Sequence, residues 1–246
     1  MSLKIPITRG DNLDNNEVIE FLDYTLLEHH IDDNDIINFC KKANMYRPAT
    51  VCIFPEKIKI AKEILNPNIS ITAVAGNFPE GSHDKEKIGK DILTAINLGA
   101  DEIDVVLEPR NTDDYPNEIE LRKLEQMRKA AKGKVLKVII ETPLLTERKK
   151  RAVARMALAV GVDFVKTCTG KRGICTEEDV KILSYELMRH ELTFKEKLGM
   201  KISGGIKDKD TVMKFMKIIN EEDSTIIPQK RLRIGASSLI DKLVTI

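Results

Sequence analysis

The segment DFVKTCTG (163–170) predicts a β-strand that ends in a turn of small and polar residues. Its apolar residues flank Lys166, and lysine is almost never buried without a partner because removing water from an ammonium group is costly. A buried amine that has lost its proton near pH 7 is a nucleophile. The segment therefore predicts that Lys166 forms a Schiff base with a carbonyl substrate.

Other segments along the chain have the same short, apolar and β-branched character. They are FLDYTLL (21–27), TVCIFP (50–55), SITAVAG (70–76), DEIDVVLE (101–108), KVLKVIIET (134–142), GMKISGG (199–205) and RLRIGASS (231–238). Segments with apolar residues at helical spacing, such as Ile88, Ile92 and Ile96, separate them. This alternation predicts an α/β fold, a single closed (β/α)8 TIM barrel. An open doubly wound sheet is the alternative, but no Gly-x-Gly-x-x-Gly turn follows a predicted strand.

Polar residues ahead of the helical segments predict N-caps at Asp84, Thr146, Thr176 and Asp208. Acidic residues in the first turn stabilise a helix, because they lie at the positive end of its dipole. The charged run ERKKR (147–151) is interpreted as the solvated start of one of these helices.

The bulk composition suits one barrel domain spanning residues 1–246, with residues 1–17 as an N-terminal extension. A net charge of +1 gives no electrostatic reason to expect nucleic acid or a membrane as partner. The chain shows no signal peptide and no apolar run of membrane-spanning length. Its cysteines, Cys40, Cys52, Cys168 and Cys175, lack Cys-x-x-Cys spacing, so neither a zinc site nor a disulfide framework is predicted. A cytoplasmic location is expected.

Charged residues interrupt four consecutive predicted strands where a barrel interior is normally apolar: Asp104, Lys137, Lys166 and Lys201. Strands of equal parity share an interior layer, so Asp104 is expected to approach Lys166 while Lys137 and Lys201 meet. Neighbouring ammonium groups disfavour one another's charge, which leaves one lysine neutral and reactive, and Asp104 can move protons. Thr167 and Thr169 follow Lys166 and favour it as the nucleophile. Lys201 is the alternative nucleophile.

Small residues end the last two predicted strands, in the segments SGG (203–205) and GASS (235–238). Such residues let backbone N–H groups approach an anion closely, and the loops after strands seven and eight are the usual phosphate site of this architecture. Gly170 and Lys171 can add another N–H group and a cation. The sequence therefore predicts a phosphorylated substrate.

These motifs together resemble the 2-deoxyribose-5-phosphate aldolase family, whose members are class I, metal-independent aldolases. The likeness covers residues 22–238 and is carried by DYTLL (23–27), VCIFP (51–55), GADEIDVV (99–106), LKVIIET (136–142), DFVKTCTG (163–170), MKISGG (200–205) and IGASS (234–238). It implies reversible cleavage of 2-deoxyribose 5-phosphate to glyceraldehyde 3-phosphate and acetaldehyde, through an imine on Lys166 and without a cofactor or metal.

The resemblance also implies roles for individual residues. It matches Lys201 to the lysine that favours a neutral nucleophile, and Asp104 to the proton-relay carboxylate. Substrate contacts are expected from Asp23, Cys52, Lys137, Thr169 and Lys171, and phosphate contacts from Gly170, Gly204, Gly205, Ser237 and Ser238. Family members are often homodimers or homotetramers.

The chain departs from the family pattern in three places. Cys168 stands where serine is commoner, and Glu108-Pro109 replaces a different loop. Some relatives carry a C-terminal tyrosine that assists proton transfer; it is missing here, so that step is expected to use water. The histidines, His29, His30, His83 and His190, are interpreted as surface or loop residues.

Two other functions remain open from the sequence. One is another Schiff-base barrel enzyme, such as a different phospho-sugar aldolase or a transaldolase-like transferase. The other is a barrel that binds a phosphorylated sugar without catalysis, in which the buried lysines form a structural charge network.

Overall fold

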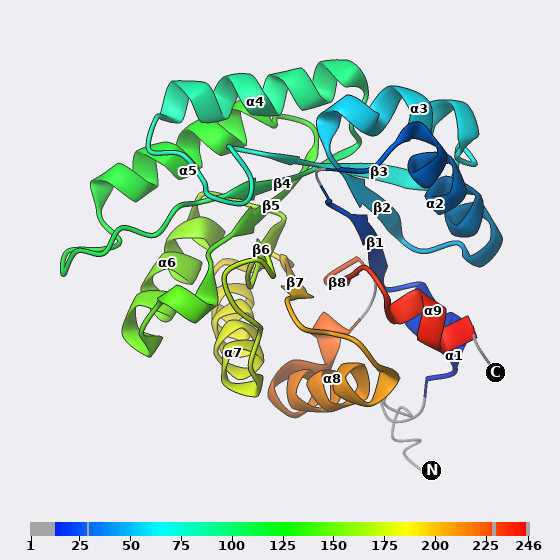
Figure 1. The fold of residues 1–246 in the computed structure, drawn as a ribbon. Helices are drawn as coiled ribbons and strands as arrows, with labels where there is room; N and C mark the ends of the chain where they lie inside the picture. The colour runs from blue at the N-terminus through cyan, green and yellow to red at the C-terminus, as the bar shows by residue number, and fades with distance from the viewer. Residues whose placement is uncertain (1–12, 29, 228–229, 245–246) are drawn as a thin grey trace, which may run out of the picture.

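Parallel strands form a closed barrel, in which each strand pairs with its neighbours in the sequence and the last pairs with the first (Figure 1). The structure, a computed structural model, describes residues 13–28, 30–227 and 230–244. The strands are β1 (Leu22–Leu26), β2 (Thr50–Ile53), β3 (Ser70–Ala75), β4 (Glu102–Val106), β5 (Val135–Ile139), β6 (Phe164–Lys166), β7 (Gly199–Ser203) and β8 (Leu232–Ala236). The predicted (β/α)8 barrel is confirmed, and the open doubly wound alternative is wrong.

Each predicted strand segment contains one observed strand, but the strands are shorter than the segments. The segment 163–170 shows why, since only Phe164–Lys166 is strand. Beyond it, the backbone N–H of Thr169 donates to the Glu141 side chain at 2.8 Å instead of to a neighbouring strand. The small and polar residues after the strands therefore lie in loops at the carboxyl end of the barrel, where this fold carries its functional groups.

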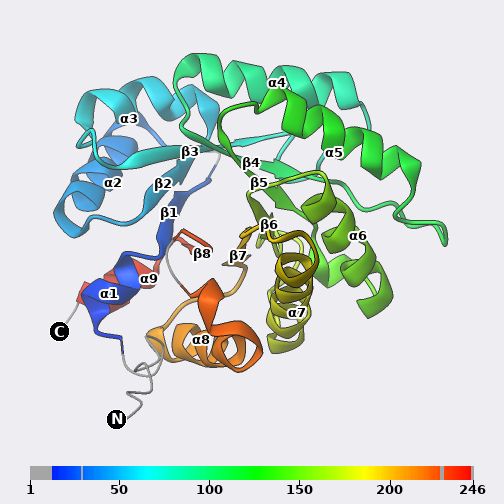
Figure 2. The ribbon, with the colours of Figure 1, turned by 180° about the vertical axis from the view of Figure 1, so that it is seen from behind.

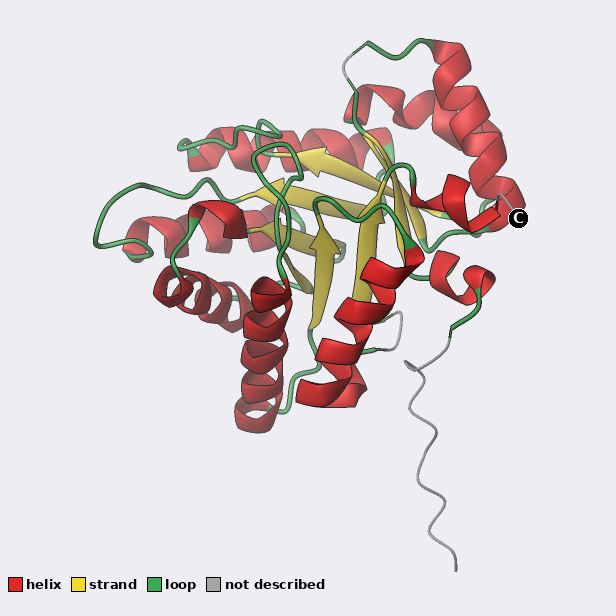
Figure 3. Cartoon of the chain, turned by 60° about the horizontal axis from the view of Figure 1, so that its bottom comes forward, coloured by secondary structure: helices red, strands yellow, loops and turns green. Residues whose placement is uncertain are grey.

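Helices cover the outside of the barrel (Figure 3). They are α1 (Asn15–Ile19), α2 (Asp33–Tyr46), α3 (Ile58–Ile64), α4 (Lys85–Leu98), α5 (Glu118–Ala130), α6 (Glu147–Ala159), α7 (Glu177–Phe194), α8 (Lys209–Asp223) and α9 (Leu239–Val244), with short 3₁₀ turns η1 (Pro55–Lys57), η2 (Thr142–Leu144) and η3 (Ser224–Ile226). The predicted N-caps are confirmed, because Asp84, Thr146, Thr176 and Asp208 accept backbone N–H groups at the starts of α4, α6, α7 and α8. The run 147–151 opens α6, as predicted.

The first and last helices pack together where the barrel closes (Figure 2). Asn15 Nδ2 of α1 donates to the carbonyl of Leu243 of α9 at 2.8 Å. Asp14 caps α1 through a reciprocal pair of hydrogen bonds with Glu17. The expected N-terminal extension 1–17 thus includes the start of α1, whereas residues 1–12 lie outside the described residues.

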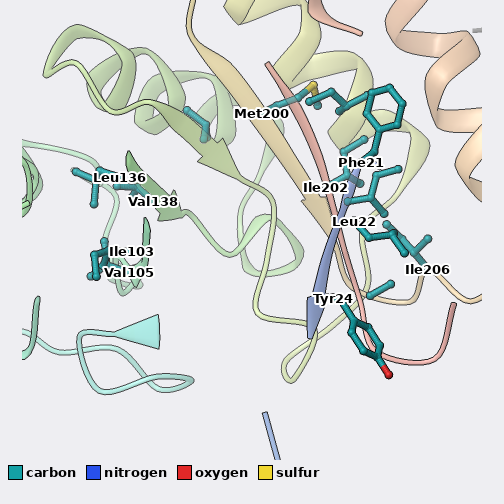
Figure 4. Close-up of a cluster of buried hydrophobic side chains, with 14 of the residues drawn as sticks. Phe21, Leu22, Tyr24, Ile103, Val105, Leu136, Val138, Met200, Ile202 and Ile206 are labelled. Carbon is teal, nitrogen blue, oxygen red and sulfur yellow. The ribbon is translucent and has the colours of Figure 1, made fainter. Parts of the chain in front are cut away.

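Alternate strand residues point outward into an apolar layer between the barrel and its helices (Figure 4). On β4, β5 and β7 these are Ile103, Val105, Leu136, Val138, Met200 and Ile202, all at most 1% exposed. Full burial of one such side chain stabilises the fold by about 1.5–3 kcal/mol. Asp104, Lys137 and Lys201 lie between these pairs, so they point into the barrel interior.

Most of the described histidines match the prediction, but His190 does not. His30 and His83 are exposed, and His29 lies outside the described residues. His190 is buried on α7, where its Nε2 is 3.0 Å from Glu196 Oε2. The prediction is wrong there because His190 lies on the buried face of α7, one and two turns after Leu187 and Leu183. No helix within the described ranges has the length and apolar character needed to cross a membrane.

Candidate active site

Asp104 on β4 lies at the centre of a buried charge cluster inside the barrel. Its Oδ2 is 2.7 Å from Lys166 Nζ and 2.7 Å from Lys201 Nζ. Its Oδ1 is 3.2 Å from Lys137 Nζ. All four residues are at most 3% exposed. The structure thus brings together the charged residues that interrupt the four predicted strands.

Asp23 on β1 provides a second carboxylate to the cluster. Its Oδ2 is 2.6 Å from Lys201 Nζ and 3.1 Å from Lys137 Nζ. Lys137 and Lys201 therefore meet, and Asp104 approaches Lys166, as strand parity predicts. The implied separation into two sets is wrong, because Asp104 also contacts Lys137 and Lys201. A lysine side chain is long enough to reach from one interior layer to the next.

Further polar residues that the sequence analysis misses extend the cluster: Thr50, Thr72, Glu102 and Arg233. Lys137 Nζ is 2.6 Å from Glu102 Oε2 and donates to Thr72 Oγ1 at 2.9 Å. Arg233 lies 3.4 Å from Glu102 and 3.5 Å from Asp23. Strand periodicity carries the missing signal, because Glu102 is two residues before Asp104 and so shares its face of β4.

The lysines and carboxylates hold one another in their charged forms. Burial opposes the charge of Lys201, but Asp104 and Asp23 outweigh it and raise its pKa above the ordinary value. Lys137 shows the same balance, and its pKa is raised as well. Burial likewise opposes ionisation of Asp104, yet the lysines around it lower its pKa well below the usual range. For Lys137 and Lys201, the expected mutual suppression of charge is therefore outweighed by the carboxylates between them.

Counted over the residues that the structure describes, the charges of this cluster do not balance when every group is ionised. Its cations are Lys137, Lys166, Lys201 and Arg233, and its carboxylates are Asp23, Glu102 and Asp104. A net buried charge is costly, so the cluster is more stable when one of its cations has lost a proton. Among the described residues, Lys166 contacts a single carboxylate, whereas Lys137 contacts three. Lys166 is therefore the lysine whose positive charge is stabilised by the fewest carboxylates.

A cavity of about 250 Å³ opens over Lys166 at the carboxyl ends of the strands. Its lining comes from the ends of β1, β6, β7 and β8 and the loops that follow them. It includes Thr25, Leu26, Leu27, Glu28, Lys166, Thr169, Gly170, Lys171, Ser203, Gly204, Gly205, Ile206, Lys207, Gly235, Ala236, Ser237 and Ser238. Asp104, Lys137 and Lys201 are not among the described residues of this lining. A molecule in the cavity therefore reaches Lys166 before any other member of the charge cluster.

The outer part of the cavity is suited to an anion. The residues predicted to bind phosphate, Gly170, Gly204, Gly205, Ser237 and Ser238, all line it. Within the described part of the chain, the backbone N–H groups of Gly204 and Gly205 have no hydrogen-bond acceptor. A Cβ at Gly204 would collide with Cys168 Sγ, so only glycine keeps this backbone close to the cavity. Lys171 and Lys207 add positive charge at the rim.

The residues predicted to contact substrate fall into two groups. Thr169 and Lys171 line the cavity. Asp23, Cys52 and Lys137 are fully buried and are not among its described lining residues. Burial raises the pKa of the Cys52 thiol, which keeps it protonated.

A buried apolar cluster, here called the apolar wall, lies beside Lys166, and its member Leu27 lines the cavity. Cys52 belongs to a buried cluster with Leu27, Phe54, Val74, Phe78, Val106 and Ile139. Lys166 Nζ lies 5.9 Å from the centre of the Phe78 ring. The amine is thus placed between an apolar wall on one side and a polar, cationic mouth on the other.

Metal-binding geometry is not found in the described residues, where no group of three or more His, Cys, Asp or Glu side chains is arranged around a common point. The carboxylates of Asp23 and Asp104 face lysines instead.

The closed barrel and the cavity over a buried amine define this protein as a (β/α)8-barrel enzyme. A sequence model of the DeoC/LacD family aldolases matches residues 17–228. The chain belongs to this family and is an aldolase.

Individual relatives support the same assignment. Deoxyribose-phosphate aldolase from Halalkalibacterium halodurans is 37% identical over 195 residues, which cover 78% of this chain and 84% of the relative. The enzyme of that name from Clostridium tetani is 36% identical, over 81% of this chain and 90% of the relative. A tetrameric deoxyribose phosphate aldolase from Aeropyrum pernix has a similar fold, with a TM-score of 0.74 over 94% of this chain and 93% of that one, at 23% identity.

Proposed function

We propose that this aldolase reversibly cleaves 2-deoxy-D-ribose 5-phosphate into D-glyceraldehyde 3-phosphate and acetaldehyde through an imine on Lys166. The observation that carries the proposal is the position of Lys166 in the cavity lining, with its Nζ 2.7 Å from the ionised Asp104. Family membership and the named relatives support the same substrate.

Lys166 is the proposed nucleophile, and Lys201 is its cationic neighbour. Both amines are 2.7 Å from the same oxygen of Asp104, so they lie no more than twice that distance apart. Lys201 keeps its proton because Asp23 and Asp104 raise its pKa against the effect of burial. A neutral Lys166 also brings the cluster of four cations and three carboxylates into balance.

The proposed reaction begins when neutral Lys166 Nζ attacks C1 of the open-chain aldehyde, and loss of water leaves a protonated imine. The 3-hydroxyl then gives up its proton, the C2–C3 bond breaks, and its electron pair forms the C1=C2 bond of an enamine. Carbon 3 becomes the aldehyde of glyceraldehyde 3-phosphate. Protonation of C2 and addition of water release acetaldehyde and restore the amine.

Asp104 is the proposed proton carrier for these steps. It lies within hydrogen-bond distance of Lys166, so it can accept the proton lost from the carbinolamine nitrogen, directly or through a water. Its carboxylate also stabilises the positive imine nitrogen that replaces the ammonium group. Because the imine is the electron sink, the proposed chemistry needs no metal ion or cofactor.

The phosphate of the substrate is proposed to bind at the outer part of the cavity. The N–H groups of Gly204 and Gly205 and the cations Lys171 and Lys207 suit a dianion there. Ser237 and Ser238, which follow the neighbouring strand β8 and line the cavity, are expected to contribute as well. Beside Lys166, the apolar wall with Phe78 suits the two carbons that leave as acetaldehyde.

Assembly and location complete the proposal. A homodimer or homotetramer is proposed from the family resemblance, and the Aeropyrum pernix relative is a tetramer. Light scattering coupled to gel filtration measures this directly. A cytoplasmic location is proposed, with support from the free state of Cys40, Cys52, Cys168 and Cys175.

Borohydride reduction tests the covalent step. The protein is mixed with 2-deoxyribose 5-phosphate, reduced, digested and mapped by mass spectrometry, with Lys166→Met as the control. We expect a substrate-derived adduct on Lys166 and none in the control. An adduct on Lys201 would exchange the two roles and leave the reaction class standing.

Product analysis separates the remaining alternatives. Acetaldehyde release supports the proposal, whereas a three-carbon ketone fragment would indicate a different Schiff-base enzyme. Absence of an adduct in folded protein, together with unchanged substrate, would refute catalysis and favour a barrel that only binds sugar phosphates.

A further inference from the structure

Arg172 connects three loops at the mouth of the barrel. It lies in the loop after β6, and its guanidinium makes a bidentate pair with Glu108 after β4, at 3.1 Å and 2.8 Å. Its Nε also donates to Glu141 after β5, at 3.1 Å. Two carboxylates from two different loops thus hold one arginine in a fixed orientation.

Glu141 connects Arg172 to residues that line the cavity. It is fully buried, and its backbone has φ +54°, a left-handed conformation that a non-glycine residue rarely adopts. Its carboxylate accepts the backbone N–H of Thr169 at 2.8 Å and the Thr169 hydroxyl at 3.0 Å. The same hydroxyl accepts the backbone N–H of Lys171 at 3.1 Å. The chain of contacts therefore runs from Arg172 through Glu141 to residues that line the cavity.

The loop after β6 is also packed tightly against its neighbours. A Cβ at Gly173 would lie 2.5 Å from Pro143 Cβ in η2, and a Cβ at Gly170 would lie 3.3 Å from Gly204 Cα. Gly170 and Gly204 are both lining residues. A shift of the loop would therefore change the distance between the two sides of the anion end.

Arg172 also compensates negative charge near the cavity. Glu141 is a buried carboxylate next to a cavity end that is suited to an anion, and unpaired it would repel that anion. Arg172 Nη2 lies 3.0 Å from Glu141 Oε2 and 2.8 Å from Glu108 Oε2, so the guanidinium contacts both carboxylates and compensates part of their negative charge. Arg172 itself is not among the described lining residues.

We infer that Arg172 is a positioning residue for the phosphate end of the cavity, acting through Glu141 and Thr169 and anchored by Glu108. This inference rests on the proposed function, since it assigns the loop after β6 to recognition of the phosphate group. Arg172 fixes the loop and offsets part of the negative charge of Glu141. It therefore affects substrates with a phosphate group far more than substrates without one.

Steady-state kinetics with two substrates tests the inference. Arg172→Leu is compared with wild type on 2-deoxyribose 5-phosphate and on unphosphorylated 2-deoxyribose. We expect KM for the phosphorylated sugar to rise on the order of tenfold or more, since small misplacements of a binding group are costly. We expect kcat for that sugar, and kcat/KM for 2-deoxyribose, to change less than about threefold. Arg122→Leu on the exposed face of α5 is the matched control, with an ion pair to Glu118 but no contact to these loops.

Two further variants separate charge from geometry and guard against misfolding. Arg172→Lys keeps the charge but cannot form the fork with both carboxylates, so we expect an intermediate KM. Glu108→Gln removes the anchor and keeps Arg172 near Glu141, so we expect a smaller rise of KM. The double variant Glu108→Gln/Arg172→Leu is expected to match Arg172→Leu, because both changes act through one loop.

Binding of inorganic phosphate, measured by titration calorimetry, keeps this inference distinct from the proposed reaction. We expect a weaker Kd for phosphate in Arg172→Leu and an unchanged Kd in Arg122→Leu, even if the true substrate is another phosphorylated carbonyl compound. Folded Arg172→Leu with wild-type KM and wild-type phosphate affinity would overturn the inference. An equal loss on both sugars would also overturn it, since it would indicate a general structural role. Wild-type protein that forms no imine would instead refute the proposed function.

Discussion

Replacement of Lys137 by methionine is the sharpest test of the buried charge cluster. Lys137 Nζ contacts Glu102 at 2.6 Å, Asp23 at 3.1 Å and Asp104 at 3.2 Å, and the side chain is fully buried. Methionine has a similar length and no charge, so the substitution removes the cation and leaves little void. Three carboxylates then share one fewer lysine inside the barrel.

The expected cost follows from this geometry. Removing one partner of a buried ion pair costs about 3–5 kcal/mol, because an uncompensated charge remains. With a urea m-value of about 3 kcal/mol/M for a chain of this size, the unfolding midpoint should fall by about 1 M or more. Urea titration followed by circular dichroism measures this shift. Lys59→Met, at an exposed position on α3, is the control and should move the midpoint only slightly.

A second substitution tests the cause of the loss. Glu102→Gln in the Lys137→Met background removes one of the carboxylates left without its lysine, so part of the lost stability should return. A Lys137→Met midpoint close to wild type would refute the reasoning that these groups form one coupled network. Equal destabilisation with and without Glu102→Gln would assign the loss to packing instead of charge.

Three further predictions follow from the same structure. The pKa values of Asp23 and Asp104 are lowered despite burial, so the stability that these carboxylates contribute is complete above about pH 4 and is lost as pH falls. The pKa values of Lys137 and Lys201 are raised, so the stability that these lysines contribute is complete below about pH 10 and is lost as pH rises further. The free energy of unfolding, measured in urea from pH 3 to 11, should fall below about pH 4 and above about pH 10, where these four groups lose their stabilising charges, and constant stability at both extremes would contradict that origin. Thr176→Ala removes the cap of α7 and should cost about 1 kcal/mol in urea unfolding, and no loss would show that the capping box contributes nothing. Gly235→Ala would place a Cβ 3.1 Å from Lys201 Cε and 2.9 Å from Ser203 Cβ. Because this crowding displaces Lys201, kcat for 2-deoxyribose 5-phosphate should fall on the order of tenfold in folded protein. An unchanged kcat would show that Lys201 has room to move.

The architecture could be predicted from the sequence because its signals are local. Short β-branched runs, helical spacing and side-chain caps such as Thr176 depend on neighbours in the chain, and each is present in the structure. Strand ends were less predictable, since they depend on contacts between strands. Thr169 belongs to a loop because Glu141, 28 residues earlier, captures its N–H group. His190 was misjudged for a similar reason, because its burial depends on the length and packing of α7.

The charge cluster was only partly predictable. A charged residue between two aliphatic residues stands out, which is how Asp104, Lys137 and Lys201 are found. Glu102 begins its strand next to Asp101, so its neighbours resemble those of a surface turn, whereas Arg233 lies between Leu232 and Ile234 and has the same pattern as the other three. Arg172 contacts Glu141 and Glu108 across three loops, and no local sequence pattern predicts these contacts.

Closure of the barrel by its first and last strands has a consequence for synthesis on the ribosome. Asp23 of β1 pairs in register with Gly235 of β8, and the two strands are separated by most of the chain. Until β8 has been made, β1 presents an open strand edge, and such edges promote aggregation. Arg233, which lies 3.5 Å from Asp23, also arrives only with β8. Closure of the barrel therefore has to wait until β8 has been synthesised.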